Sequence, residues 1–160
     1  MPLVHESSAP LAGDSDKALD FALGVLTGAG FRLTDRAPTS IETTGPGFHN
    51  SRESPLRGAS TIRIEDRNGA LNLYAELGGV EWMAKFLTWF PNLMCLGVGI
   101  VLTIVFLLTM GPGWWIGLVV GIVAADAMLW LVLGPFIAKK LEARTRTELD
   151  TLVVNAAGIG

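Results

Sequence analysis

Asp126 is the residue whose chemistry stands out first, because it interrupts a long apolar stretch. It is the only Asp, Glu, Lys or Arg between Lys85 and Lys139. An ionisable side chain at bilayer depth is a functional-site hypothesis, here a proton carrier or a polar anchor to another subunit. The competing interpretation is a hydrogen-bonded structural aspartate. Counting away from the connecting turn predicts that Asp126 lies level with Gly97 and Gly99, where exposed backbone could satisfy the carboxyl group.

The other reactive side chains show no catalytic or metal-binding pattern. His5 and His49 lack metal-ligand spacing, and we expect both to be solvent-exposed loop residues. The single cysteine, Cys95, excludes an intramolecular disulfide and a Cys/His zinc pattern. The glycines between residues 24 and 30 fail the GxGxxG spacing and follow a predicted helix, which excludes a dinucleotide fingerprint. The sequence therefore predicts no cofactor, no metal ion and no enzymatic activity.

A glycine- and proline-containing segment, residues 45–60, is the one candidate binding loop. It carries His49, Arg52 and Arg57, and Gly45 allows unusual backbone angles there. These side chains could bind an anion or a protein, but no nucleophile with a base and an orienting group accompanies them. The sequence favours a mobile hairpin connection between two strands over such a binding loop.

The composition argues against two broad classes of protein. Of the 160 residues, 50% are hydrophobic and 17% are charged, and the apolar residues are concentrated in one block. This distribution excludes an ordinary soluble domain. The net charge is −3 with basic residues interspersed among acidic ones, so no sustained basic surface is present for nucleic acid.

The apolar block is long enough for two membrane-spanning helices. A bilayer core about 30 Å thick requires about 20 apolar residues in a helix. We expect spans at residues 92–110 and 114–136, separated by a tight Gly111-Pro112-Gly113 turn that neither helix easily crosses. The block therefore predicts a transmembrane helical hairpin.

Charged and aromatic residues predict the orientation of this hairpin. Its turn has no positive charge, whereas basic residues flank both spans on the other side, so the positive-inside rule places both termini in the cytoplasm, on an inner membrane. No seven-residue apolar run occurs in the first 14 residues, so we expect no cleavable signal peptide. Amphipathic indole rings favour headgroup depth, and basic side chains anchor the cytoplasmic side. The predicted interfacial anchors are Trp82, Trp89, Trp114, Trp115, Lys139 and Lys140.

Small residues on the second span predict a contact with a partner. Gly117, Gly121 and Ala125 form a stripe that would let another helix approach closely. At 100° per residue, Gly121 and Gly117 lie about 140° and 180° from Asp126. The first span, with its close-approach site at Gly97 and Gly99, can cover only one of these two faces. We therefore expect the other face to meet a partner subunit or a second copy.

The residues before the apolar block predict a small α+β head. A helix begins after Asp14 or Ser15, which can cap it, and Gly28 or Gly30 can end it. Extended stretches follow at residues 32–35, 40–44, 61–66 and 70–77, with Asn68-Gly69 suited to a type I′ hairpin turn. The expected fold class is a two-layer helix on an antiparallel sheet, fused to the transmembrane hairpin.

The expected organisation of the whole chain has five parts. They are a flexible leader (1–13), the cytoplasmic head (14–79), an interfacial helix (80–91), the transmembrane hairpin (92–136) and a C-terminal amphipathic helix and tail (137–160) that returns to the head. Such a small head would lean on the membrane helices or on a partner.

These features favour a non-enzymatic accessory or assembly subunit of a larger inner-membrane complex. Its expected partners are the lipid bilayer and other membrane-protein subunits or a second copy. One alternative is a homo-oligomeric channel or proton-pathway component that uses Asp126. Another is a membrane-tethered regulatory module that binds through residues 45–60.

Overall fold

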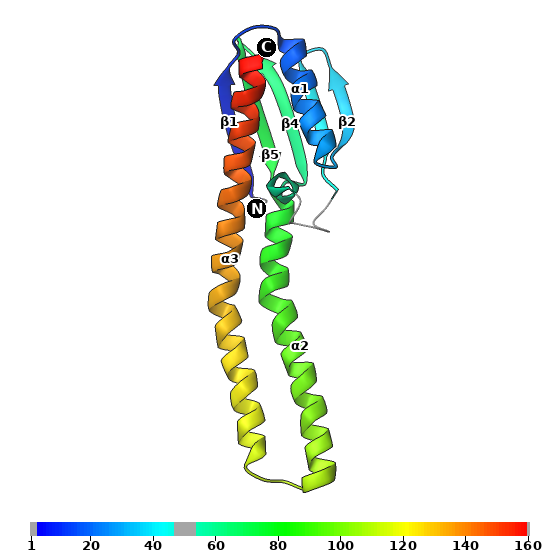
Figure 1. Cartoon of the computed structure of the whole chain (residues 1–160), viewed down its shortest axis with the longest axis vertical. Helices are drawn as coiled ribbons and strands as arrows, with labels where there is room; N and C mark the ends of the chain where they lie inside the picture. Colours follow the sequence, from blue (N-terminus) through cyan, green and yellow to red (C-terminus); the bar gives the residue numbers. More distant parts are fainter. Residues whose placement is uncertain (1–2, 47–53, 160) are drawn as a thin grey trace. The chain divides into compact units, whose positions relative to one another are not determined.

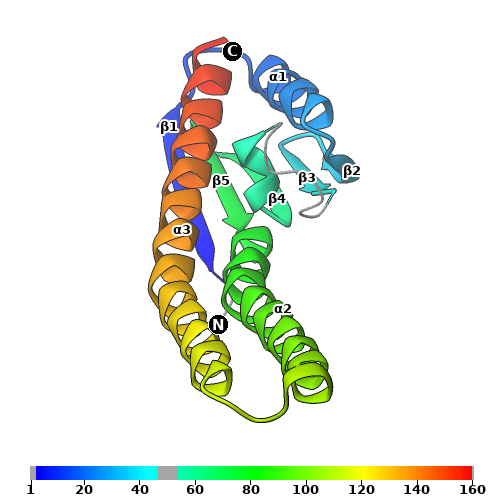
Figure 2. The same ribbon diagram turned by 60° about the horizontal axis from the view of Figure 1, so that its bottom comes forward.

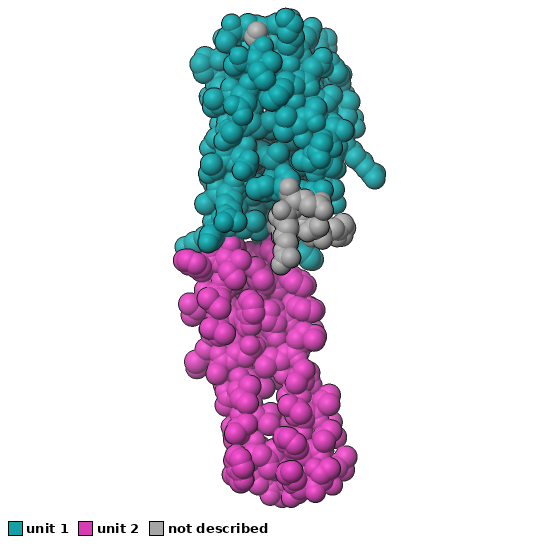
Figure 3. Space-filling view, viewed as in Figure 1, with its two compact units in different colours: residues 1–82, 139–160 teal, residues 83–138 magenta. Residues whose placement is uncertain are grey.

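The computed structural model describes residues 3–46 and 54–159. The chain forms two compact units, which Figure 3 colours separately. The head unit consists of Met1–Trp82 together with Lys139–Gly160, and the hairpin unit consists of Met83–Ala138. The head is therefore discontinuous in sequence.

An antiparallel sheet of five strands, in the order β1-β5-β4-β3-β2, forms the centre of the head unit (Figure 1). The strands are β1 (Val4–Pro10), β2 (Arg32–Ala37), β3 (Ser40–Thr44), β4 (Thr61–Arg67) and β5 (Ala70–Glu76). Asn68 and Gly69 join β4 to β5 with φ angles of 58° and 74°, as a type I′ turn requires. The small antiparallel sheet and its hairpin turn are thus confirmed.

Strand β1 corrects the expectation of a flexible leader at residues 1–13. It pairs with β5 from Val4↔Glu76 to Pro10↔Ala70. Without β1, the backbone N–H and C=O groups on that side of β5 would lack ladder partners. Its inward-facing residues are small or polar, so the alternation carries no hydrophobic signal, and the prediction was wrong for this reason.

Helix α1 (Ser15–Gly28) packs against the sheet as expected. The side chain of Asp14 accepts a hydrogen bond of 3.0 Å from the backbone N–H of Asp16, which caps the first turn. After the helix, Gly30 has a φ of 93° and turns the chain toward β2. The buried face of α1 consists of Ala18, Leu19, Ala22 and Leu26.

The last residues of the chain also belong to the head core, which confirms that the tail returns to the head. Figures 1 and 2 show the end of α3 beside β1 and β5, and α1 beside β2 and β3. Both helices and the sheet share one buried cluster. The α3 residues in it are Leu149, Leu152, Val153, Ala156 and Ala157, and the strand residues include Ile41, Ile62, Ile64, Leu71, Leu73 and Ala75.

Two long helices replace the four helical segments expected from the sequence. Helix α2 runs from Gly78 to Met110 and α3 from Trp115 to Ile159. The helix therefore does not break where the interfacial helix (80–91) was expected to meet the first span. It also does not break where the second span was expected to meet the C-terminal helix (137–160). Pro91 lies inside α2, where the side-chain amide nitrogen of Asn92, Nδ2, donates a 2.6 Å hydrogen bond to the Thr88 carbonyl. A proline removes one backbone donor without ending a helix whose other bonds continue.

In the hairpin unit, the two helices pack together and are joined at residues 111–114. Gly111 there has a φ of 72°, which favours glycine. Helices α2 and α3 are both long and apolar enough to cross a membrane, and 6% of the most apolar window of each is buried. Most large apolar side chains of this unit are consequently exposed.

Candidate functional site: the helical hairpin and the polar contacts of the head

The carboxyl group of Asp126 meets the thiol of Cys95 inside the hairpin unit. The two side chains lie close enough to interact electrostatically. The second carboxyl oxygen of Asp126, Oδ2, is buried and has no hydrogen-bond partner in the described part of the chain. The face of α3 that carries Asp126 is therefore the face that α2 covers.

The expected level of Asp126 beside Gly97 and Gly99 is wrong by about one helical turn. Gly99 faces Val123 instead, since a Cβ on Gly99 would lie 2.9 Å from the Val123 Cγ2 atom. The count assumed that both helices start level at the turn. Trp115, the first residue of α3, packs edge-on against Phe106, with ring centroids 5.4 Å apart. Helix α3 thus begins about one turn short of the end of α2.

The small residues predicted to form a packing interface divide into two groups. Gly99 is buried between the helices, and a Cβ there would clash with α3. A Cβ added at Gly97, Gly117 or Gly121 would meet no atom within 4 Å, and Ala125 is exposed. The predicted stripe on α3 is therefore open space within this chain. It lies on the side of α3 away from Asp126.

An apolar groove of about 470 Å³ runs between the two helices of the hairpin unit. From α2 it is lined by Leu96, Gly99, Ile100, Thr103 and Ile104, and from α3 by Val119, Val120, Val123, Ala124 and Ala127. The hydroxyl of Thr103 donates to the Gly99 carbonyl at 2.7 Å, so the one polar side chain is already satisfied. Gly117 lies three residues before Val120, and Gly121 lies three residues before Ala124, so the open stripe adjoins the groove.

The predicted interfacial anchors have different environments. Trp82, Trp89 and Trp114 are exposed, with 82% of Trp114 accessible. Lys139 and Lys140 are also exposed. Trp115 is buried instead, and its indole N–H donates to the Gly111 carbonyl at 3.0 Å. Trp115 therefore stabilises the turn of the hairpin.

Part of the candidate binding loop lies outside the described residues, including His49 and Arg52. Arg57 is described and lies in a short 3₁₀ turn, Pro55–Gly58. Its Nε–H donates a 3.0 Å hydrogen bond to the backbone carbonyl of Ala29, after α1. Arg57 thus connects this turn to the end of α1.

A polar cluster of His5, Ser7 and Asp150 was not predicted, and it corrects the expectation of an exposed loop histidine. His5 lies in β1 with 11% of its side chain exposed, and its Nε2 is 2.8 Å from Asp150 Oδ1 on α3. Burial raises the pKa of Asp150. Hydrogen bonds from Ser7 and His5, and the charges of His5 and Arg146, lower it by more, so the pKa of Asp150 lies below its ordinary value. Both His5 and Ser7 contact the carboxylate of Asp150. In a serine–histidine–aspartate relay the serine contacts the histidine instead, so this cluster is not arranged as such a relay. The cluster ties β1 to α3.

A search of the described residues finds no group of three or more His, Cys, Asp or Glu side chains that could hold a metal ion. Comparison of the chain with protein-family models, with curated proteins and with solved structures finds no match.

Proposed function

We propose that this chain is a non-enzymatic accessory subunit of a larger inner-membrane protein complex. The hairpin unit crosses the membrane, and its open face packs against helices of a partner. The chain's exposed apolar surface supports the membrane part of this proposal. Helices that are this apolar and 6% buried would be unstable in water, because each exposed Leu, Ile, Val or Phe side chain loses about 1.5–3 kcal/mol relative to burial.

The open stripe on α3 is the observation that carries the proposal of a partner helix. A Cβ added at Gly117 or Gly121 would meet no atom of another described segment within 4 Å, although α2 is packed on the opposite face of α3. In lipid, helix association depends on close backbone approach at small residues, because lipid tails are as apolar as the side chains. The groove beside the stripe would receive the side chains of such a helix. A third helix therefore fits this face.

The flanking charges favour termini on the cytoplasmic side. Lys139 and Lys140 are exposed at the end of the apolar part of α3, and the turn at Gly111–Gly113 has no charge. Cysteine-accessibility labelling tests this orientation. A cysteine introduced at Gly113, in a Cys95→Ser background, should react with an impermeant maleimide from the periplasmic side, and a cysteine at Ser8 should not.

Gentle detergent extraction from the native membrane tests the proposal of a partner. The tagged chain should have the native mass of a complex that contains a foreign chain in fixed ratio. Gly121→Leu fills the open stripe and should release that chain. Ile122→Phe adds volume at the same depth, 100° around the helix, and should leave the complex intact. Recovery of the wild type as a monomer would refute the accessory-subunit proposal, and recovery as a homo-oligomer would replace the foreign partner with a second copy.

A proton pathway through Asp126 is a second candidate, and one observation favours it. The Oδ2 atom of Asp126 is buried and has no partner among residues 3–46 and 54–159, which leaves an acceptor free for a proton or a polar group. Asp126→Asn keeps the size and an acceptor but removes the acid. In vesicles loaded with a pH-sensitive dye, a proton pathway predicts that this substitution abolishes flux. The accessory-subunit proposal predicts no flux in either chain.

A further inference from the structure

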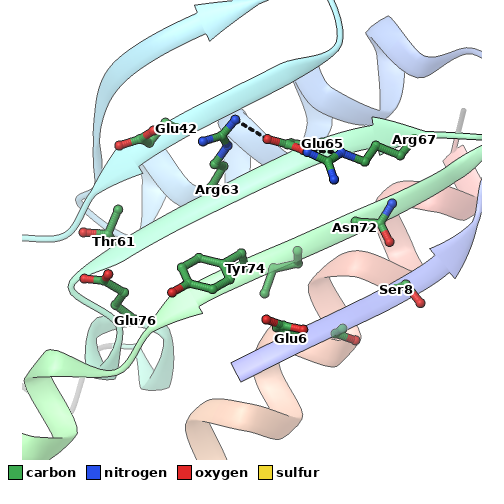
Figure 4. Close-up of a pocket in the computed structure, with 12 residues that line it drawn as sticks. Glu6, Ser8, Glu42, Thr61, Arg63, Glu65, Arg67, Asn72, Tyr74 and Glu76 are labelled. Carbon is green, nitrogen blue, oxygen red and sulfur yellow. Dashed lines mark ion pairs between the residues drawn. The ribbon is translucent and has the colours of Figure 1, made fainter. Parts of the chain in front are cut away.

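One face of the head sheet is hollow and lined with polar side chains. Helix α1 and the end of α3 pack on the other face, where the inward residues of the strands are buried. The hollow has a volume of about 640 Å³ and extends over β1, β3, β4 and β5 (Figure 4). The strand residues that alternate with the core residues therefore form a surface that is separate from the core.

The register places a row of four side chains straight across this surface. Glu6 pairs with Tyr74, Tyr74 with Arg63, and Arg63 with Glu42. Directly opposed side chains on neighbouring strands have Cβ atoms about 4.5–5.5 Å apart. Figure 4 shows Tyr74 in the middle of this row, with Glu6 and Glu76 near its ring and Arg63 directed toward Glu65.

The charges on this surface are unbalanced. Both arginines of the hollow bind one carboxylate, since Glu65 forms ion pairs with Arg63 and with Arg67, the latter at 2.8 Å. The other three glutamates, Glu6, Glu42 and Glu76, have no basic partner among the described side chains. The surface therefore repels anionic ligands and attracts cations.

The Tyr74 ring adds a specific feature to this negative surface. Tyr74 is 40% exposed, although β5 lies between two other strands of the sheet. A Lys or Arg cation within about 6 Å of a tyrosine ring is attracted by the ring's electrons. Carboxylates beside the ring, from Glu6 on the neighbouring strand and Glu76 two residues along, would neutralise such a cation.

We propose that the open sheet face binds an extended basic segment of a partner protein, with a Lys or Arg side chain stacked on Tyr74 between Glu6 and Glu76. A segment fits better than a small cation because the free carboxylates are widely spread. Glu6 on β1 and Glu42 on β3 are three strand spacings apart, about 14 Å. An extended chain covers that distance in about four residues, and residues i and i+4 project to the same side.

The test uses the full chain in an uncharged detergent and a fluorescent nine-residue peptide. The peptide consists of serine and threonine with arginines at positions 3 and 7, and the control peptide has its arginines at positions 3 and 4. Fluorescence anisotropy should show binding of the spaced peptide at least about fivefold tighter than binding of the control peptide. Raising the salt concentration should weaken this binding, because exposed charges are screened.

Two sets of variants locate the binding site. The double variant Glu6→Gln with Glu76→Gln should weaken binding about tenfold. The control double variant, Asp16→Asn with Glu148→Gln, changes the net charge by the same amount at exposed helix positions. It should weaken binding less than twofold. Tyr74→Leu should weaken binding about three- to tenfold, and Tyr74→Phe should retain it.

Equal effects of the two double variants, or equal affinity for the two peptides, would overturn the proposal. So would unchanged binding by Tyr74→Leu. If the Glu6 and Glu76 double variant fails to fold, Glu42→Gln and Tyr74→Leu decide the question alone. The surface lies entirely in the head unit, so this result is independent of whether the hairpin unit has a partner helix.

Discussion

Leu149→Ala tests whether the end of α3 is an integral part of the head. Leu149 is completely buried in the cluster that also contains Ile62, Leu71 and Leu73. It is separated in sequence from all three of these residues by the entire apolar block. If α3 lay only loosely against the sheet, truncating this side chain would have little effect on the strands.

The magnitude follows from the burial of Leu149. Replacing a fully buried leucine by alanine removes its transfer free energy and leaves a cavity, which together destabilise a core by about 2.7–5.0 kcal/mol. Val154 is five residues further along the same helix and 61% exposed. Val154→Ala is therefore the matched control, with an expected effect within about 0.5 kcal/mol.

Hydrogen exchange of β4 and β5 amides, followed by mass spectrometry on the full chain in detergent, measures this effect. These strands are central in the sheet, so their amides report the opening of the core. A loss of 2.7–5.0 kcal/mol corresponds to exchange that is about 100-fold to several thousandfold faster. Exchange in Leu149→Ala no faster than in Val154→Ala would refute the assignment of α3 to the head core.

Two further substitutions test the polar cluster and the hairpin turn. Asp150→Asn should destabilise the head at neutral pH by no more than about 1 kcal/mol, because the carboxylate is 50% exposed and screened. The folded-state pKa of Asp150 is depressed, so its stabilisation is present above the unfolded pKa of about 3.9 and is lost as the pH falls through the folded pKa. Urea unfolding of the two chains should therefore differ at pH 6 and converge in acid. Gly69→Ala places a side chain at a φ of 74° and should cost about 1–2 kcal/mol in the same assay, whereas Asn68→Gly, at a φ of 58°, should be nearly neutral.

Local patterns predicted much of the head fold. The alternating residues of β4 and β5, with Asn68-Gly69 between them, specify a hairpin from short-range information alone. The cap at Asp14 similarly marks the start of α1. Strand β1 lacks such a pattern, because its inward residues are His5, Ser7 and Ala9. Its position depends on pairing with β5, whose paired residues lie 60 to 72 positions away in sequence.

The candidate sites were less predictable because they depend on contacts between distant residues. His5 and Asp150 are 145 residues apart, and neither has a neighbour in sequence that marks it as one of a pair. The partner of Asp126 depends on where α3 begins relative to Phe106, which is set by the packing of Trp115 and not by the number of turn residues. The open stripe was predictable, since the angle between Gly117 and Asp126 follows from helical geometry.

The discontinuity of the head has a consequence for the order in which the chain folds. The five α3 residues of the head core, from Leu149 to Ala157, follow all of α2 and the apolar part of α3 in the sequence. They are synthesised after both apolar stretches, so the head core cannot close until the apolar block has left the ribosome. A domain of about 80 residues buries little more than 60% of the surface of its unfolded chain, and the loss of five buried side chains leaves it with an incomplete core. Residues 3–82 alone are therefore not the folded head, because the sheet needs the end of α3 to cover the face beside β1 and β5.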